Sequence, residues 1–413
     1  MPVVNESTQL RVAKLIMVTA SNNNKYYDME ENPDGTFMVK YGRVGATASV
    51  SCYPIKKWES KLREKLRKGY KDQTHLFSTK KKETIITGIE NAAVGALIAD
   101  LMSFASKSIE MNYSVRADQV SKQQLGEAQD ILDQLVNLTQ LNLDVDHFNK
   151  RLLDLYQVIP RRMGNVRGHL LQLIPKDAEG LQEVEEKLAE EQATLDVMRS
   201  QVELNKDKDE DQSDSQEVNL LRDLGLEVEE ENDPAVIKKI KKLMKDDASS
   251  FYRAFAVKNI ATQQYFDGFY KDARYKKTAL FWHGSRNENW LSILKTGLVL
   301  RPANAVINGK MFGYGLYFAD KFKKSLNYTS LRGSYWTRGS QDRGYLALFD
   351  VHVGKQLKIK KHQPWCYDLS EDNLRARGTY DSLYAKGGAD LINNEYIVYN
   401  SAQCTIRYLV EVR

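Results

Sequence analysis

Three short stretches in the last third of the chain differ from ordinary core sequence: FWHGSRNENW at 281–290, MFGYGLYFAD at 311–320 and NNEYIVYN at 393–400. In the first, an apolar strand pattern leads directly into His283 and Gly284. In the second, two glycines flank a tyrosine and lead into Leu-Tyr-Phe. Because a strand pattern rather than a helix follows these glycines, a Rossmann-type nucleotide turn is excluded.

Together, the three stretches resemble the catalytic signature of the poly(ADP-ribose) polymerase family. That family transfers ADP-ribose from NAD and is marked by a His–Tyr–Glu triad, which in this sequence is His283, Tyr317 and Glu395. Taken alone, His283 fits a structural hydrogen-bonding residue at a strand end, and Glu395 fits a glutamate facing water. The resemblance implies instead that both lie in a cleft that holds NAD as substrate, with no metal.

The resemblance also implies roles for individual residues. His283 bonds the adenosine ribose, the Gly284 backbone and the Ser325 hydroxyl bond the nicotinamide amide, and the rings of Tyr317 and Tyr328 enclose the nicotinamide. The implied NAD-binding set is His283, Gly284, Ser285, Ser292, Arg301, Tyr317, Ser325 and Tyr328.

Glu395 is the residue expected to carry the chemistry. Cleavage of the nicotinamide–ribose bond builds positive charge on the sugar, as glycoside cleavage does. A fixed carboxylate stabilises that charge, and its flanking residues Tyr396, Ile397 and Val398 predict partial desolvation, which strengthens the effect.

Two positions depart from the family pattern. Val299 stands where the family has an arginine on the adenosine side, and Arg301 is the expected substitute on the same strand face. Lys310 replaces an aromatic residue before Met311. The first departure concerns NAD affinity, and the second concerns the acceptor; Met311 itself favours chain elongation.

The first eighty residues predict a small sheet with a basic helix. Strands are expected at 10–19, 36–43 and 46–53, and a helix at 56–70. Tyr41, Gly42 and Arg43 fit either a plain turn or a stacking residue beside a cation for nucleic acid. Their spacing resembles the WGR domain of several ADP-ribose polymerases, with tyrosine in place of tryptophan. The resemblance implies that Tyr41 faces a nucleic-acid end and that Arg43 relays binding to the next domain.

The middle of the chain has helical periodicity. Helices are expected at 89–106, 122–137, 146–158 and 178–204, and the last fits a coiled coil or a helix packed in a bundle. This order resembles the helical regulatory domain of DNA-dependent ADP-ribose polymerases, with LLDLYQVIP at 152–160 as the closest local match. The implied role is autoinhibition that nucleic acid relieves.

Charge and cysteine content limit the possibilities further. Residues 1–85 carry 16 Lys/Arg against 9 Asp/Glu, whereas residues 176–235 carry 6 against 21. A basic module beside an acidic one favours a nucleic-acid-facing end and a solvated joint, or charge that only keeps both soluble. The three cysteines form no Cys-x-x-Cys pair, which argues against a zinc module and a disulfide scaffold. We expect an intracellular, soluble protein without a membrane partner. Its expected location is the nucleus if the source is eukaryotic and the cytoplasm if the source is bacterial or viral.

The sequence therefore predicts an α+β multidomain protein. Its expected parts are a WGR-like sheet at 1–80, an all-α regulatory bundle at 84–205, an acidic linker at 206–217 and a mixed α/β ADP-ribosyltransferase fold at 218–413. The expected function is a transferase activated by DNA (or RNA) ends or breaks that builds poly(ADP-ribose) on protein acceptors, itself included. A mono-ADP-ribosyltransferase of the same fold and a non-catalytic nucleic-acid-binding scaffold are the alternatives.

Overall fold

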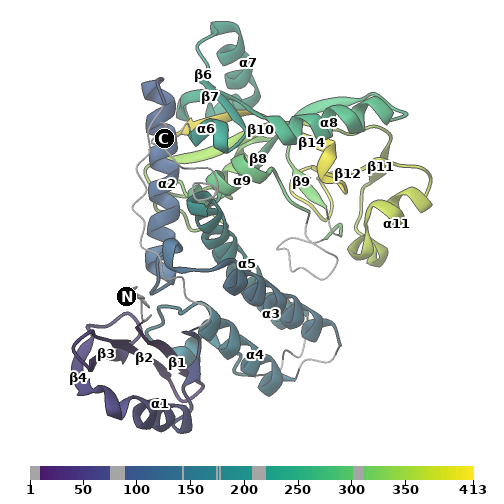
Figure 1. Ribbon diagram of the computed structural model, residues 1–413. Helices are drawn as coiled ribbons and strands as arrows, with labels where there is room; N and C mark the ends of the chain where they lie inside the picture. The colour runs from purple at the N-terminus through teal and green to yellow at the C-terminus, as the bar shows by residue number, and fades with distance from the viewer. Residues whose placement is uncertain are drawn as a thin grey trace. The chain divides into compact units, whose positions relative to one another are not determined.

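The computed structural model of the protein describes residues 10–74, 89–141, 144–173, 175, 178–206, 220–300, 311–313 and 315–413. These residues form helices and three β-sheets, so the chain is of the α+β class (Figure 1). Two compact units divide the chain: residues 1–83 with 108–205, and residues 84–107 with 206–413.

The first unit contains an antiparallel five-stranded sheet, drawn purple in Figure 1, in the order β4-β3-β2-β1-β5. Its strands are β1 (Val12–Thr19), β2 (Asn23–Glu31), β3 (Thr36–Arg43), β4 (Ser49–Pro54) and β5 (Lys71–Asp72). Helix α1 (Trp58–Arg67) places the buried Trp58 edge-on to the buried Phe37 of β3, with ring centroids 5.1 Å apart. One face of the sheet is thereby covered.

Strand β3 has the range that the sequence predicted, but β2 was missed. Its sequence, NNKYYDMEE, is rich in Asn, Asp and Glu, which are depleted in strands. Tertiary contacts override that preference, because Tyr27 and Met29 are buried and the amide of the buried Asn24 donates to the Arg161 carbonyl at 3.0 Å.

Among the described residues, four long helices lie in the middle of the chain: α2 (Ala92–Asn112), α3 (Lys122–Leu141), α4 (Val145–Val158) and α5 (Ala178–Lys206). Three keep to within four residues of their predicted ranges, and α2 ends six residues beyond its predicted end. α5 packs within this chain, since Gln192 and Gln129 of α3 exchange hydrogen bonds of 2.8 Å. By length and composition alone, α2 is apolar enough to cross a membrane. One third of it is buried, and its buried residues recur at helical spacing (Val94, Leu97, Ile98, Leu101, Ala105), which is typical of a helix packed on a core.

The second unit contains two sheets, ordered β6-β7-β14-β10-β8 and β11-β12-β13-β9. The strands are β6 (Leu226–Glu230), β7 (Phe251–Asn259), β8 (Thr278–Gly284), β9 (Leu316–Phe318), β10 (Gly344–His352), β11 (Gln356–Ile359), β12 (Ser382–Ala385), β13 (Glu395–Val398) and β14 (Cys404–Val412). The helices are α6 (Leu220–Asp223), α7 (Pro234–Met244), α8 (Ile260–Asp272), α9 (Trp290–Thr296), α10 (Phe322–Leu326) and α11 (Glu371–Ala376). Strand β10, which is buried over nearly its whole length, pairs with the central strand β14 and with the edge strand β8.

One backbone bridge joins the two sheets of the second unit. The N–H of Trp282 donates to the carbonyl of Ala319 at 2.9 Å, and the reverse bond is 3.0 Å long. Strand β9 in turn pairs with β13, with Tyr317 opposite Ile397. Strand β9 therefore lies between β8 and β13, although 112 positions of sequence separate His283 from Glu395.

Candidate active site

The three motif residues His283, Tyr317 and Glu395 come from the three neighbouring strands β8, β9 and β13. Register brings them into adjacent rows: Trp282 pairs with Ala319, and Tyr396 pairs with Phe318. The topology of two joined sheets thus brings together residues that no local sequence pattern connects.

His283 is held as a neutral imidazole with a fixed tautomer. Its Nδ1 lies 3.1 Å from the carbonyl oxygen of Tyr317. Because a carbonyl can only accept, Nδ1 carries the hydrogen, and Nε2 is left with a lone pair. Burial lowers the pKa of His283, and the bond to the Tyr317 carbonyl opposes that effect only in part. The imidazole therefore offers an acceptor at neutral pH.

Gly284 lies against the backbone of α10 at a distance that only glycine permits. A Cβ at this position would lie 1.9 Å from the carbonyl oxygen of Ser325, whose side chain is buried. Alternate residues of a strand direct their N–H and C=O to the same side. The backbone N–H and C=O of Trp282 bond Ala319. The N–H and C=O of Gly284, two residues further along the strand, therefore point to the same side, toward β9. A polar backbone edge is thus presented next to the Ser325 hydroxyl.

The phenol of Tyr317 is fixed by two hydrogen bonds. It donates to the Gly313 carbonyl at 2.9 Å and accepts from the Phe312 N–H at 3.1 Å. Burial, chiefly, raises the pKa of Tyr317 far above its usual range, and the nearby Glu395 charge acts in the same direction. Because the Tyr317 hydroxyl is already hydrogen-bonded within the protein, the part of this side chain that can contact a ligand is its ring.

The carboxylate of Glu395 forms a buried ion pair with Lys324 of α10. Lys324 Nζ lies 2.5 Å from Glu395 Oε1, and only 14% and 16% of the two side chains are exposed. Burial raises the pKa of Glu395 despite the attraction of Lys324, and burial lowers the pKa of Lys324 despite the attraction of Glu395. Lys324 also donates to the Asn394 carbonyl at 3.1 Å, which fixes the ammonium between neighbouring residues.

Tyr328 follows α10 and completes one wall. Burial raises the pKa of Tyr328 to about 12, and the charge of Glu395 adds to the effect. About 40% of the side chain is exposed. Glu395, Tyr317 and Tyr328 therefore share one electrostatic environment. The whole arrangement can hold a flat ring between aromatic side chains and place a carboxylate beside a developing positive charge.

Comparison with known proteins agrees with this geometry. The family model of the poly(ADP-ribose) polymerase catalytic domain matches residues 233–413. In Invertebrate iridescent virus 6, the uncharacterized protein 101L is 34% identical over 46% of this chain and 78% of its own length. A poly(ADP-ribose) polymerase-like protein of the same virus, 100L, is 32% identical over 39% of this chain and 85% of its own length.

This chain belongs to the poly(ADP-ribose) polymerase family. The relationship extends beyond the catalytic segment: poly(ADP-ribose) polymerase 2-B of Oryza sativa subsp. japonica is 26% identical over 95% of this chain and 70% of its own length. The protein is accordingly an NAD-dependent ADP-ribosyltransferase.

The remaining residues of the predicted polymerase site are placed less centrally. The Ser285 hydroxyl accepts from the Asn289 amide at 3.0 Å, just before α9. Ser292 lies within α9, and its carbonyl accepts from Thr296 at 3.0 Å. Arg301, predicted as the adenosine-side arginine, lies outside the described residues, as does Lys310.

Sequence reasoning missed Lys324. The signal was present in KKSLNY, where a lysine precedes Ser325, but nothing local says that its ammonium meets a glutamate 71 positions later. Among the residues that the structure describes, no cluster of three His, Cys, Asp or Glu side chains suits a metal ion.

The predicted nucleic-acid motif of this polymerase-family chain lies in the first unit. Tyr41 is about one third exposed, with its ring 5.7 Å from that of Tyr27. The Arg43 guanidinium donates to the carbonyls of Asn22 and Gly164 at 2.9 and 2.8 Å, and to that of Met163 at 3.3 Å. Arg43 thus connects the sheet to the loop that follows α4. Gly42 has room for a Cβ, whose nearest neighbour would be 3.5 Å away.

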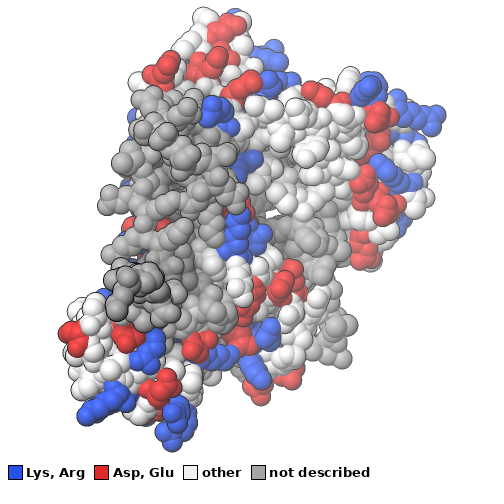
Figure 2. Space-filling view, viewed as in Figure 1, with Lys and Arg blue, Asp and Glu red and all other residues white. Residues whose placement is uncertain are grey.

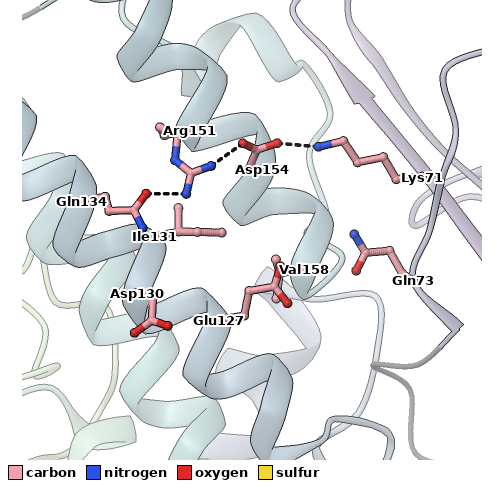
Figure 3. Close-up of a pocket in the computed structure, with 9 residues that line it drawn as sticks. All are labelled: Lys71, Gln73, Glu127, Asp130, Ile131, Gln134, Arg151, Asp154 and Val158. Carbon is pink, nitrogen blue, oxygen red and sulfur yellow. Dashed lines mark hydrogen bonds and ion pairs between the residues drawn. The ribbon is translucent and has the colours of Figure 1, made fainter.

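A second feature of the first unit is a polar cavity of about 340 Å³ (Figure 3). Its lining comes from β5, the segment after it, α3 and α4: Lys71, Gln73, Glu127, Asp130, Ile131, Gln134, Arg151, Asp154 and Val158. Asp154 bonds Lys71 at 2.6 Å and Arg151 at 2.8 Å. None of the predicted site residues lines it, so it is separate from the candidate active site.

Proposed function

We propose that this polymerase-family enzyme is activated by nucleic acid and builds poly(ADP-ribose) on protein acceptors, itself included, with release of nicotinamide. The observation that supports it most is the buried carboxylate of Glu395, held by Lys324 on a strand that pairs with the strand of Tyr317, which is in turn bridged to the strand of His283. A carboxylate kept charged and out of water acts most strongly on a developing cation.

In the proposed complex, NAD is bound in an extended form. His283 accepts through Nε2 from the adenosine ribose, and the backbone of Gly284 pairs with the nicotinamide amide, to which the Ser325 hydroxyl adds a bond. Tyr317 and Tyr328 cover the two faces of the nicotinamide ring. Ser285 and Ser292 line the wall toward the nucleotide, and Arg301 bonds its adenosine side.

The proposed reaction breaks the bond between ribose C1′ and the nicotinamide nitrogen, and the electron pair leaves with nicotinamide. Glu395 bonds the 2′-hydroxyl of that ribose and stabilises the positive charge on the sugar. An acceptor oxygen then bonds C1′, and a hydroxyl acceptor gives up its proton, with Glu395 positioned to polarise it. Lys324 contributes by keeping Glu395 ionised.

Activation is assigned to residues 1–80 and the helical segment 84–205, joined to the catalytic segment 218–413 through the acidic linker 206–217. Exposed lysines and arginines of α1 and the turns on either side of it include Lys56, Lys57, Arg63, Arg67 and Lys68. Figure 2 shows Lys and Arg side chains gathered at the foot of the view, where Figure 1 draws α1. Such a surface suits the phosphates of DNA or RNA ends. Tyr41 meets the end, and Arg43 relays the event to residues 163–164.

A reducing, intracellular location is part of the proposal, in the nucleus if the source is eukaryotic and in the cytoplasm if it is bacterial or viral. It is supported by three cysteines that are all free thiols.

The test is incubation with labelled NAD, with and without nicked DNA. A ladder of products on the enzyme that depends on DNA supports the proposal, whereas one discrete shift supports single ADP-ribose transfer. Glu395→Gln should slow nicotinamide release about a hundredfold or more, equivalent to about 2.7–4 kcal/mol of barrier. Unchanged turnover by Glu395→Gln would refute the role of this carboxylate.

A further inference from the structure

The loop between α10 and β10, residues 329–343, is fixed by hydrogen bonds within itself. The Arg332 N–H donates to the Gln341 carbonyl at 2.8 Å, and the Gln341 N–H donates to the Ser330 carbonyl at 2.9 Å. Beneath them, the buried hydroxyls of Thr329 and Ser334 lie 3.0 Å apart. A loop so tied has little backbone entropy left to lose when it binds a ligand.

This fixed loop presents two large aromatic side chains to solvent. Tyr335 is 71% exposed and Trp336 is 63% exposed, with ring centroids 4.8 Å apart. The N–H of Trp336 donates to the Asn327 carbonyl at 3.1 Å, which fixes the base of the side chain. The indole is stacked with the ring of Tyr328, at 25° and 6.4 Å between centroids. Aromatic faces therefore continue from the proposed nicotinamide wall to the surface.

The loop and the helix before it are basic. Residues 321–343 include six Lys or Arg and one acidic residue, Asp342; of the six, Lys324 is paired with Glu395 and Arg343 with Asp100. Among the described residues, Arg332 pairs only with Asp342, and both side chains are more than 70% exposed, so the pair is weak in water. Arg338 is exposed and forms no ion pair with any described residue. In proteins that bind single strands, rigid aromatic rings stack on the unpaired bases, and cations without a strong ion-pair partner bind the phosphates. This loop carries both kinds of side chain.

We infer that residues 329–343 form a binding site for single-stranded nucleic acid. An unpaired base stacks on the exposed indole of Trp336 and the ring of Tyr335, and the adjoining phosphates are met by Arg338 and Arg332. The interior base pairs of a duplex are excluded from the stacking contact because their bases are already stacked on each other. The site is separate from the Tyr41 region and does not depend on the transferase reaction.

Tryptophan fluorescence of the full chain tests the inference, because Trp336 is the most exposed of the five tryptophans. The measurement uses a twelve-nucleotide single strand in a Tyr41→Ala background, so that the first sheet does not dominate binding. The oligonucleotide should quench the fluorescence and protect it from iodide. Trp336→Ala should weaken binding about tenfold, or about 1.4 kcal/mol. Trp336→Phe should retain most of the affinity, because phenylalanine also stacks.

Charge is tested separately through salt dependence. Arg338→Gln should lower the slope of log affinity against log salt by about 0.7, the value for one phosphate contact on a single strand. Tyr265→Ala is the matched control, since this tyrosine of α8 is 69% exposed outside the loop. It should leave both readings unchanged.

Three results would overturn the inference. They are equal binding by Trp336→Ala and its parent, equal or tighter quenching by a covalently closed circular duplex, and quenching by poly(ADP-ribose) but not by the oligonucleotide. Thermal melting of each variant separates misfolding from lost binding. If the alanine variant melts at a lower temperature than its parent, the affinity of Trp336→Phe, which keeps an aromatic ring, is the second measurement that tests stacking.

Discussion

Replacing Lys324 with methionine should slow turnover by an amount that depends on pH. Lys324 is paired with Glu395 at 2.5 Å, with about 15% of each side chain exposed, so solvent screens the pair little. A charge-assisted hydrogen bond of this kind contributes about 1.5–3 kcal/mol to the ionised carboxylate. Loss of this hydrogen bond makes the ionised fraction of Glu395 about 10- to 150-fold smaller at each pH at which the carboxyl of the variant is mostly protonated.

The direction follows from the charges. Burial already raises the pKa of Glu395, and Lys324 opposes that rise. Without Lys324 the pKa of Glu395 rises further, so the ionised form that the proposed reaction needs appears only at higher pH. The deficit should therefore be largest on the acid side and shrink as the pH increases through the pKa of Glu395 in the variant.

The assay is the pH profile of kcat for nicotinamide release at saturating NAD, compared among the wild type, Lys324→Met and Lys324→Arg. Arginine preserves the positive charge, so its acid limb should stay near that of the wild type. Parallel profiles, with Lys324→Met reduced by one factor at every pH, would refute the electrostatic account and leave Lys324 a packing residue.

Three further predictions concern other parts of the chain. Gly284→Ala should raise KM for NAD and lower Tm, because a Cβ 1.9 Å from the Ser325 carbonyl forces the two segments apart; an unchanged KM with unchanged Tm would contradict the contact. Arg43→Ala removes bonds to the carbonyls of Met163 and Gly164 and should abolish most DNA stimulation of nicotinamide release while DNA binding, measured by anisotropy, stays within a few fold; equal stimulation would exclude the relay. The side chains of Arg161 and Glu191 are 2.9 Å apart and at most 10% exposed, so Glu191→Gln leaves Arg161 charged and without its ion-pair partner in the interior. This variant should lower the free energy of unfolding, measured by denaturant titration, by about 3–5 kcal/mol. Glu190→Gln, at an exposed neighbouring position, is the control and should change the free energy little.

The sequence predicted elements where side chains alternate or repeat clearly, and it failed where tertiary contacts decide. β3 (Thr36–Arg43) has the predicted bounds because its side chains alternate as in a half-buried strand, with Phe37 and Val39 buried. Helix α8 (Ile260–Asp272) was missed, since tyrosines and glutamines obscure its periodicity and only the Asn259 side chain, bonded to the Thr262 N–H at 2.9 Å, marks its start.

Similar limits apply to the candidate site. His283, Tyr317 and Glu395 could be named because each lies in a compact motif, and their placement on adjacent strands needed the fold. Lys324 could not be named, because an ion pair across 71 positions leaves no local pattern. The buried state of Glu191 was equally hidden: a helix rich in Glu does not indicate which carboxylate meets an arginine from another segment.

The close approach of Gly284 to Ser325 also bears on resistance to inhibitors. A compound that mimics nicotinamide by pairing with the Gly284 backbone uses N–H and C=O groups that every amino acid carries, so exchanging a side chain cannot remove them. Adding a side chain at position 284 would push α10 away, and with it the lysine beside Glu395, the proposed catalytic residue. Escape from such a compound would therefore cost the enzyme its own activity.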